Sequence, residues 1–127
     1  MVPEDLKYTP THEWCRIEGD VATIGVTEVA LKDLGSVIYV SLPDQDADVL
    51  EEISFGEIEG MEGTTDILSP FDGAVEAVNT RVAHNPDLVA EDPYDAGWLI
   101  KLRLDGPAEV ERLLSAEEYE QIAKKRR

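Results

Sequence analysis

Short β-rich runs separated by turn residues are the feature that most constrains the fold of this chain. They follow one another closely from the first tryptophan to Leu104, with glycine, proline, aspartate or asparagine between them. Runs of this length and spacing predict a mainly β fold, a small sandwich or barrel. The runs are Trp14–Ile17, Val21–Val26, Val37–Val40, Ile53–Glu59, Ile67–Leu68, Ala74–Val78 and Trp98–Leu104.

One helical signal interrupts the runs. Thr27 can cap a short helix near 28–34, whose apolar residues share one face, and Gly35 can end it. The helix has about two turns at most, because an α-helix has 3.6 residues per turn. We expect it to pack across a sheet edge.

The C-terminal part changes to helical spacing. Pro107 occupies a favoured first helical position, and residues 107–123 are predicted to form a helical extension packed on the β domain. A second start lies inside this extension, because Ser115 and Glu118 have the spacing of a capping box. The apolar positions are Val110, Leu113, Leu114, Tyr119 and Ile122.

A weak internal repeat accompanies the strands. Gly35–Val40 and Gly73–Val78 share a glycine and two valines at equal spacing, and acidic stretches follow each, Asp46–Glu52 and Asp87–Asp92. Two similar halves would bury each other's apolar face about a pseudo-twofold axis. The predicted class is therefore a flattened barrel or sandwich of two halves.

Composition limits the function classes. With 127 residues and 43% hydrophobic side chains, residues 1–127 can form a single domain, and Cys15, the only cysteine, excludes an internal disulfide. The net charge of -17 repels phosphates and anionic lipids, which excludes nucleic-acid and membrane partners and favours a monomer. Acidic charge speeds docking onto basic proteins, although it also simply maintains solubility. We expect a cytoplasmic protein, or one of the mitochondrial matrix if a eukaryotic transit peptide has been removed.

Catalytic and metal motifs are absent from the sequence. It contains no phosphate loop, nucleophile elbow or paired-histidine helix, so we expect no enzyme and no catalytic residue. His12, Glu13 and Cys15 lie close in sequence, but strand alternation separates neighbouring side chains and His84 is the only other histidine. We therefore predict no metal site.

The segment Gly56–Pro70 predicts a hairpin. Two β-like runs flank a tip at which Gly60 and Gly63 can adopt positive φ, so Met61 and Glu62 would be displayed at its end. Such a tip suits a carrier that presents an attached group. Most glycine-containing tips are simply turns, so the pattern alone leaves both interpretations open.

Several sequence blocks between Leu6 and about Tyr119 form a family signature. They are Tyr8–Trp14, Ala22–Thr27, Leu34–Gly35, Val40–Pro43, Ser69–Pro70, Gly73, Val78–Asn79, Asp92–Tyr94, Gly97–Lys101 and Leu113–Tyr119. Together they resemble the glycine cleavage H-protein family. The resemblance implies a flattened β-barrel or sandwich of two similar halves, related to lipoyl and biotinyl carrier domains, with flanking helices.

The tip departs from the family pattern. The family's lipoyl lysine lies three residues after a glutamate, and the corresponding positions here are Glu59 and Glu62. A carboxylate cannot supply the amine that forms the lipoyl amide, so no cofactor is expected. Lys32 and Lys101 are not expected to substitute, and Gly60 and Gly63, in place of bulkier family residues, should loosen the turn.

The resemblance also implies a cleft that shelters the arm. Its matching positions are Thr11, Glu13 and Asp66. Alternatively, Glu13 and Asp66 only hydrogen-bond backbone groups near the hairpin. His12 and Trp14 are expected to serve packing.

The family role implied is to shuttle the aminomethyl group of glycine on a lipoyl arm. The implied partners are glycine decarboxylase (P protein), aminomethyltransferase (T protein) and dihydrolipoamide dehydrogenase. We expect this chain to be a homologue that is not itself lipoylated. The alternative is a non-carrier scaffold or regulatory module that binds glycine-cleavage or lipoate-assembly enzymes.

Overall fold

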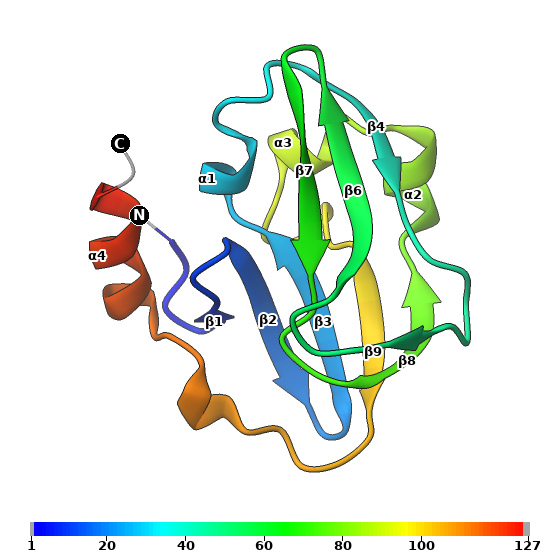
Figure 1. Ribbon diagram of the computed structural model, residues 1–127, viewed down its shortest axis with the longest axis vertical. Coiled ribbons are helices and arrows are strands. Elements are labelled where there is room, and N and C mark those ends of the chain that lie inside the picture. The colour runs from blue at the N-terminus through cyan, green and yellow to red at the C-terminus, as the bar shows by residue number, and fades with distance from the viewer. Residues whose placement is uncertain (1, 126–127) are drawn as a thin grey trace.

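Residues 2–125 are described here from a computed structural model of the protein (Figure 1). The strands are β1 Lys7–Tyr8, β2 Glu13–Glu18, β3 Val21–Val26, β4 Val37–Ser41, β5 Asp48–Val49, β6 Ser54–Gly60, β7 Gly63–Leu68, β8 Gly73–Val78 and β9 Ile100–Leu104. The helices are α1 Glu28–Leu31, α2 Thr80–His84, α3 Leu88–Glu91, a 3₁₀ turn Val110–Arg112 and α4 Ala116–Lys125.

Two antiparallel sheets form the molecule. The larger has the strand order β1-β2-β3-β9-β8-β5, and the smaller has the order β4-β6-β7. In Figure 1 the β6–β7 hairpin crosses in front of the larger sheet. This two-sheet, mainly β architecture confirms the predicted barrel-sandwich class.

Apolar side chains fill the space between the sheets. One buried cluster joins Val26 of β3 to Val40, Ile58 and Ile67 of the smaller sheet, and Val82 of α2 closes one side. Burying an aliphatic side chain of this size contributes about 1.5–3 kcal/mol. The core therefore fixes how the β6–β7 hairpin lies on the larger sheet.

Each predicted β run overlaps a strand, although several bounds differ. The strand expected at Ile67–Leu68 begins earlier, at Gly63, and the one expected from Trp98 begins at Ile100. The two-residue strands β1 and β5 and the short helices α2 and α3 were not predicted. Of the two repeat segments, Gly35–Val40 contains most of β4, in the smaller sheet, and Gly73–Val78 forms β8, in the larger sheet.

The helix predicted near 28–34 is shorter than expected. It spans only Glu28–Leu31, and Gly35 follows it at φ +70°. Thr27 is the N-cap residue, but its hydroxyl contacts the Tyr119 hydroxyl at 2.6 Å rather than capping the helix. The prediction of a Thr27 side-chain cap was wrong because a tertiary hydrogen bond takes the hydroxyl.

The C-terminal prediction was half right. The helix expected from Pro107 is only the 3₁₀ turn, because Leu114 exchanges backbone hydrogen bonds with Tyr8 and this pairing requires extended chain. The capping box is confirmed, since the Glu118 amide donates to Ser115 Oγ and the Ser115 amide donates to Glu118 Oε1. Within residues 2–125, the helices fall short of the length and apolar character needed to span a membrane.

Candidate functional site

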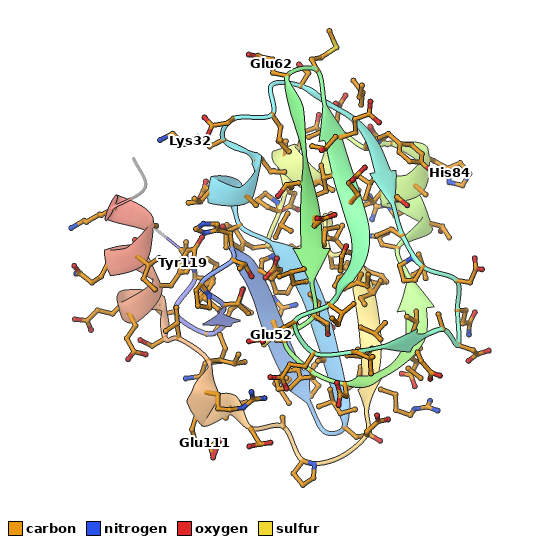
Figure 2. All side chains as sticks on the ribbon, in the orientation of Figure 1. Lys32, Glu52, Glu62, His84, Glu111 and Tyr119 are labelled. Carbon is orange, nitrogen blue, oxygen red and sulfur yellow. The ribbon has the colours of Figure 1, made fainter. Side chains whose placement is uncertain are left out.

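The β6–β7 hairpin ends in a two-residue tip. Gly60 pairs with Gly63, which leaves Met61 and Glu62 as the turn. Both side chains are exposed, and Figure 2 shows Glu62 at the extreme upper end of the molecule. The tip therefore displays residue 62, as the sequence predicted for a presenting hairpin.

The predicted role of the tip glycines was wrong. Neither Gly60 nor Gly63 has positive φ. Gly60 is required by close packing, because a Cβ atom there would lie 2.1 Å from the carbonyl oxygen of Leu34. Glycine here permits close backbone approach instead of an unusual φ.

The tip is fastened to the loop that follows α1, contrary to the expected loosening. The Met61 amide donates to the Ser36 carbonyl at 2.9 Å, and the Glu62 amide donates to the Leu34 carbonyl at 2.8 Å. The Glu62 side chain lies over Gly35, where a Cβ atom would be 2.7 Å from Glu62 Oε2. Backbone atoms thus hold the tip, and the Glu62 side chain is not needed for this.

A cavity of about 330 Å³ opens at the opposite end of β7. Six-residue β7 separates it from the tip by about 17 Å, at about 3.3 Å per residue. The lining combines proline and leucine side chains with hydroxyl and carboxyl groups. It consists of Thr9, Pro10, Thr11, Glu13, Glu51, Glu52, Leu68, Ser69 and Pro70.

Glu13 is the buried acid of this cavity, with 1% of its surface exposed. Its Oε1 atom accepts hydrogen bonds from the hydroxyls of Thr9 at 2.6 Å and Thr11 at 2.5 Å, and its Oε2 atom accepts from the Leu68 amide at 3.2 Å. The Leu68 contact ties β2 to β7 of the hairpin.

Burial raises the pKa of the Glu13 carboxyl above its ordinary value, while the hydrogen bonds from Thr11, Thr9 and Leu68 oppose the shift. A cationic group placed against Glu13 would favour its ionised form. The cavity therefore suits a ligand that combines an apolar stem with a positive or hydrogen-bond-donating end.

A tight turn positions these groups. The Thr9 amide donates to the Glu13 carbonyl, and His12 closes the turn at φ +78°. His12 Nδ1 lies 2.7 Å from the Tyr119 hydroxyl, which connects the turn to α4. His12 and Trp14 are both buried, and Trp14 Nε1 donates to the Pro93 carbonyl at 2.9 Å.

Asp66 lies two residues before Leu68 of the cavity wall. It is exposed on β7, accepts a hydrogen bond from the Ser54 hydroxyl at 3.4 Å, and lines a neighbouring depression that also includes Thr11. The structure therefore brings Thr11, Glu13 and Asp66 into one region. Glu59 and Glu62 lie apart from it, toward the tip.

Sequence reasoning missed several cavity residues. Thr9 could have been found, because a hydroxyl group four residues before an acidic residue in a proline-containing turn can donate a hydrogen bond to its carboxylate. Glu51 and Glu52 carried no such signal, since only the tertiary fold brings the β5–β6 turn beside Thr9. Leu68 contributes through its backbone, which side-chain patterns do not reveal.

Comparisons with known proteins agree on one family. The model of the family "Glycine cleavage H-protein" matches residues 6–126. A glycine cleavage system H protein of Rubrobacter xylanophilus is 48% identical over 118 residues, 93% of this chain and 91% of that protein. The mitochondrial glycine cleavage system H protein 3 of Arabidopsis thaliana is 46% identical over 118 residues, covering 93% of this chain and 71% of the relative.

A solved structure shows the same architecture. The crystal structure of a glycine cleavage system H protein from Mycobacterium marinum superposes with a TM-score of 0.85 at 36% identity, covering 94% of this chain and 97% of that one. Sequence and fold thus agree over nearly the whole length. The chain belongs to the glycine cleavage H-protein family.

Proposed function

We propose that this chain is a glycine cleavage system H-protein homologue that is not lipoylated at residue 62. The observation that carries the proposal is Glu62, at the tip where the resemblance places the family's lipoyl lysine. Lipoylation requires a nucleophilic amine to attack an activated acyl group, and a carboxylate offers no such nitrogen. The arm of the family's shuttle is therefore missing from its usual anchor.

Lys32 and Lys101 do not replace that anchor in this proposal. Lys32 follows the short helix α1, and Lys101 lies within β9 with its Nζ atom 5.4 Å from the centre of the Trp98 ring. Neither residue occupies a hairpin tip. A lipoate ligase that recognises the hairpin tip would therefore find no amine there.

Protein binding is the role that this fold retains without an arm. We propose that the chain acts as a scaffold or regulator of glycine decarboxylase, aminomethyltransferase, dihydrolipoamide dehydrogenase or lipoate-assembly enzymes. The net charge of -17, which attracts basic partners, supports this role.

Coexpression with a lipoate ligase, followed by intact-mass measurement, tests the lipoylation proposal. The wild-type chain should gain no lipoyl mass. Glu62→Lys should gain one lipoyl group, because the backbone anchors the tip and the new amine needs no refolding. Glu59→Lys, with a lysine three residues earlier on the same hairpin, is the matched control and should stay unmodified. A lipoyl group on the wild-type chain would refute the proposal.

A further inference from the structure

The turn between β5 and β6 exposes two large aliphatic side chains. Leu50 is 58% exposed and Ile53 is 57% exposed, and they flank Glu51 and Glu52. Glu52 is labelled in Figure 2, where this turn lies across the middle of the molecule. Most of the apolar surface of these two side chains stays in water after folding, so it becomes buried only if another molecule covers it.

Backbone hydrogen bonds hold this turn in one shape. The Ile53 amide donates to the Leu50 carbonyl at 3.2 Å, which closes the turn. The Glu52 amide donates to the Ser69 carbonyl at 2.8 Å, and the Ser69 amide donates back to Ile53 at 3.4 Å. The Glu51 amide donates to the Asp72 carboxylate at 2.7 Å.

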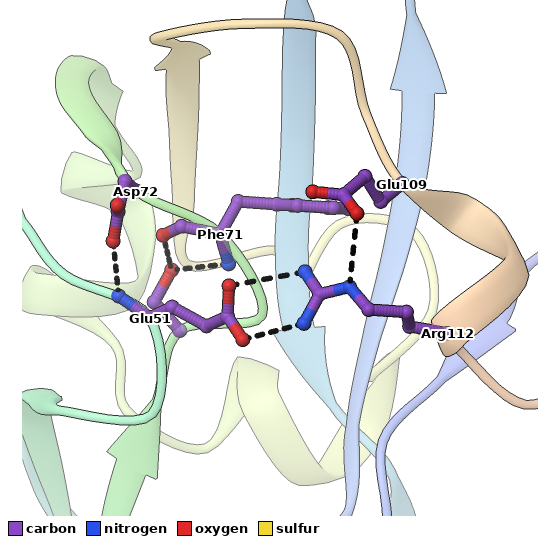
Figure 3. Close-up of polar contacts among 6 residues, drawn as sticks. Glu51, Phe71, Asp72, Glu109 and Arg112 are labelled. Atoms are coloured by element: carbon purple, nitrogen blue, oxygen red, sulfur yellow. Dashed lines mark hydrogen bonds and ion pairs between the residues drawn. The ribbon is translucent and has the colours of Figure 1, made fainter.

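A guanidinium clamp adds to these bonds (Figure 3). Arg112, in the segment between β9 and α4, donates to both carboxylate oxygens of Glu51, at 2.6 and 3.0 Å, and its Nε atom lies 3.8 Å from Glu109. Bidentate pairs of this kind fix direction as well as distance. The segment that precedes α4 thus braces the turn through Glu51.

The turn also contains backbone strain. Glu52 has φ +63°, a left-handed conformation that residues with a Cβ atom rarely adopt. Such a conformation persists only where surrounding contacts impose it. Here those contacts are the backbone bonds to Ser69, the bond to Asp72 and the Glu51–Arg112 pair, which hold the exposed turn in one conformation.

We propose that the turn Leu50–Ile53 is a docking epitope for a partner protein that covers Leu50 and Ile53 with an apolar pocket and surrounds them with arginine or lysine side chains. Rigid apolar groups contribute most to binding because little conformational entropy is lost. The basic rim follows from charge complementarity, since exposed Asp48, Glu52 and Asp72 border the turn.

A second copy of this chain does not fit the same description. A symmetric dimer through this turn would place identical acidic patches face to face, in a chain of net charge -17. The partner is therefore a different protein, of opposite charge. The inference rests on the proposed function in one respect, the choice of glycine-cleavage enzymes as candidate partners.

Binding measurements on purified proteins test the epitope. The probes are glycine decarboxylase, aminomethyltransferase and dihydrolipoamide dehydrogenase from the same source, titrated against the full chain by calorimetry. The double variant Leu50→Ser/Ile53→Ser should bind its partner at least about tenfold more weakly than wild type. Its urea midpoint should be unchanged, because both side chains are exposed.

The matched control is Ile38→Ser/Tyr39→Ser, which removes two aliphatic or aromatic side chains that are 47% and 57% exposed on β4. It should change the Kd less than about threefold, as surface truncations outside a binding centre do. Glu52→Gln should slow association at low salt, and the difference should vanish at high salt.

Three results would overturn the epitope: equal binding by the Leu50/Ile53 variant and wild type, an equal loss in the control, or no wild-type binding tighter than about 100 µM to any probe. The lipoylation proposal fails differently, through a lipoyl mass on the wild-type chain. The scaffold proposal fails only through the third result, because the first two require a probe that binds wild type. The failures are therefore distinguishable.

Discussion

Replacing Gly60 with alanine tests whether close packing, rather than turn flexibility, holds the hairpin tip. A Cβ atom at position 60 would lie 2.1 Å from the Leu34 carbonyl oxygen, 2.7 Å from Leu34 Cβ and 2.8 Å from the Leu34 carbonyl carbon. Two of these atoms are backbone, so no side-chain rotation relieves the overlap. The loop after α1 must move away from the tip.

The cost can be estimated from what that movement breaks. The amides of Met61 and Glu62 would lose their bonds to Ser36 and Leu34, at about 1 kcal/mol each. Forcing a methyl group into a packed site costs about 1–3 kcal/mol more. We therefore expect Gly60→Ala to lower the free energy of unfolding by about 3–5 kcal/mol, a large part of the usual 5–15 kcal/mol.

Gly63→Ala is the matched control in the same hairpin. The nearest atom to its Cβ position is Leu34 Cδ2 at 3.7 Å, an ordinary contact, so this variant should be neutral or stabilised by up to about 1 kcal/mol. Urea unfolding at pH 7 gives both free energies, and hydrogen exchange at the Met61 and Glu62 amides reports the tip directly. Values for the two variants within about 0.5 kcal/mol of each other would refute the packing argument.

Three further predictions concern the cavity and α4. Tyr119→Phe removes the hydroxyl that contacts His12 Nδ1 and Thr27 Oγ1, and urea unfolding should show a loss of about 1–3 kcal/mol. Burial raises the pKa of Glu13 in the folded state, so the contribution of Glu13 to stability should fall as the pH rises from about 4.5 through the raised pKa. The stability of wild type relative to Glu13→Gln should therefore decrease between pH 4 and pH 8. An increase over this range would contradict the raised pKa. Ser115→Ala should cost about 1 kcal/mol and reduce helical circular dichroism, and an unchanged melting curve would exclude a capping contribution.

Sequence patterns predicted the β elements well because each strand carries its own signal. Val21–Val26 was predicted with the observed bounds, since it alternates and ends between turn residues. The helices α2 and α3 were missed because four or five residues give less than two turns of periodicity. For elements this short, caps decide: the Asn79 side chain accepts from the Arg81 amide at the start of α2.

The two wrong helical predictions have a common cause. The spacing after Pro107 is helical, but Leu114 pairs with Tyr8, and strand pairing keeps the chain extended there. Thr27 occupies the position of an N-cap residue in the sequence, yet its hydroxyl forms a hydrogen bond with the Tyr119 hydroxyl instead. In both places a residue distant in the chain replaced the local interaction, which no window of neighbouring residues reveals.

The candidate site was predictable only in part for the same reason. Thr11 and Glu13 came from the family resemblance, and the sequence had no means to show that Glu13 reaches the Leu68 amide, 55 positions later. One alternative considered for Glu13, a hydrogen bond to backbone near the hairpin, is therefore seen. It coexists with a cavity, because the same carboxyl group both ties β2 to β7 and forms a cavity wall.

The arrangement of the tip explains how the anchor residue can change while the fold persists. The hairpin is held by the amides of residues 61 and 62 and by the close approach of Gly60 to Leu34, and the exposed Glu62 side chain is not part of these contacts. Substitution at position 62 therefore exchanges an amine for a carboxylate at little cost in stability, whereas position 60 has no room for a side chain. We therefore expect the single substitution Glu62→Lys to restore a displayed amine without disturbing the tip. A larger residue at position 60 would displace the loop after α1, whose backbone holds the tip in place.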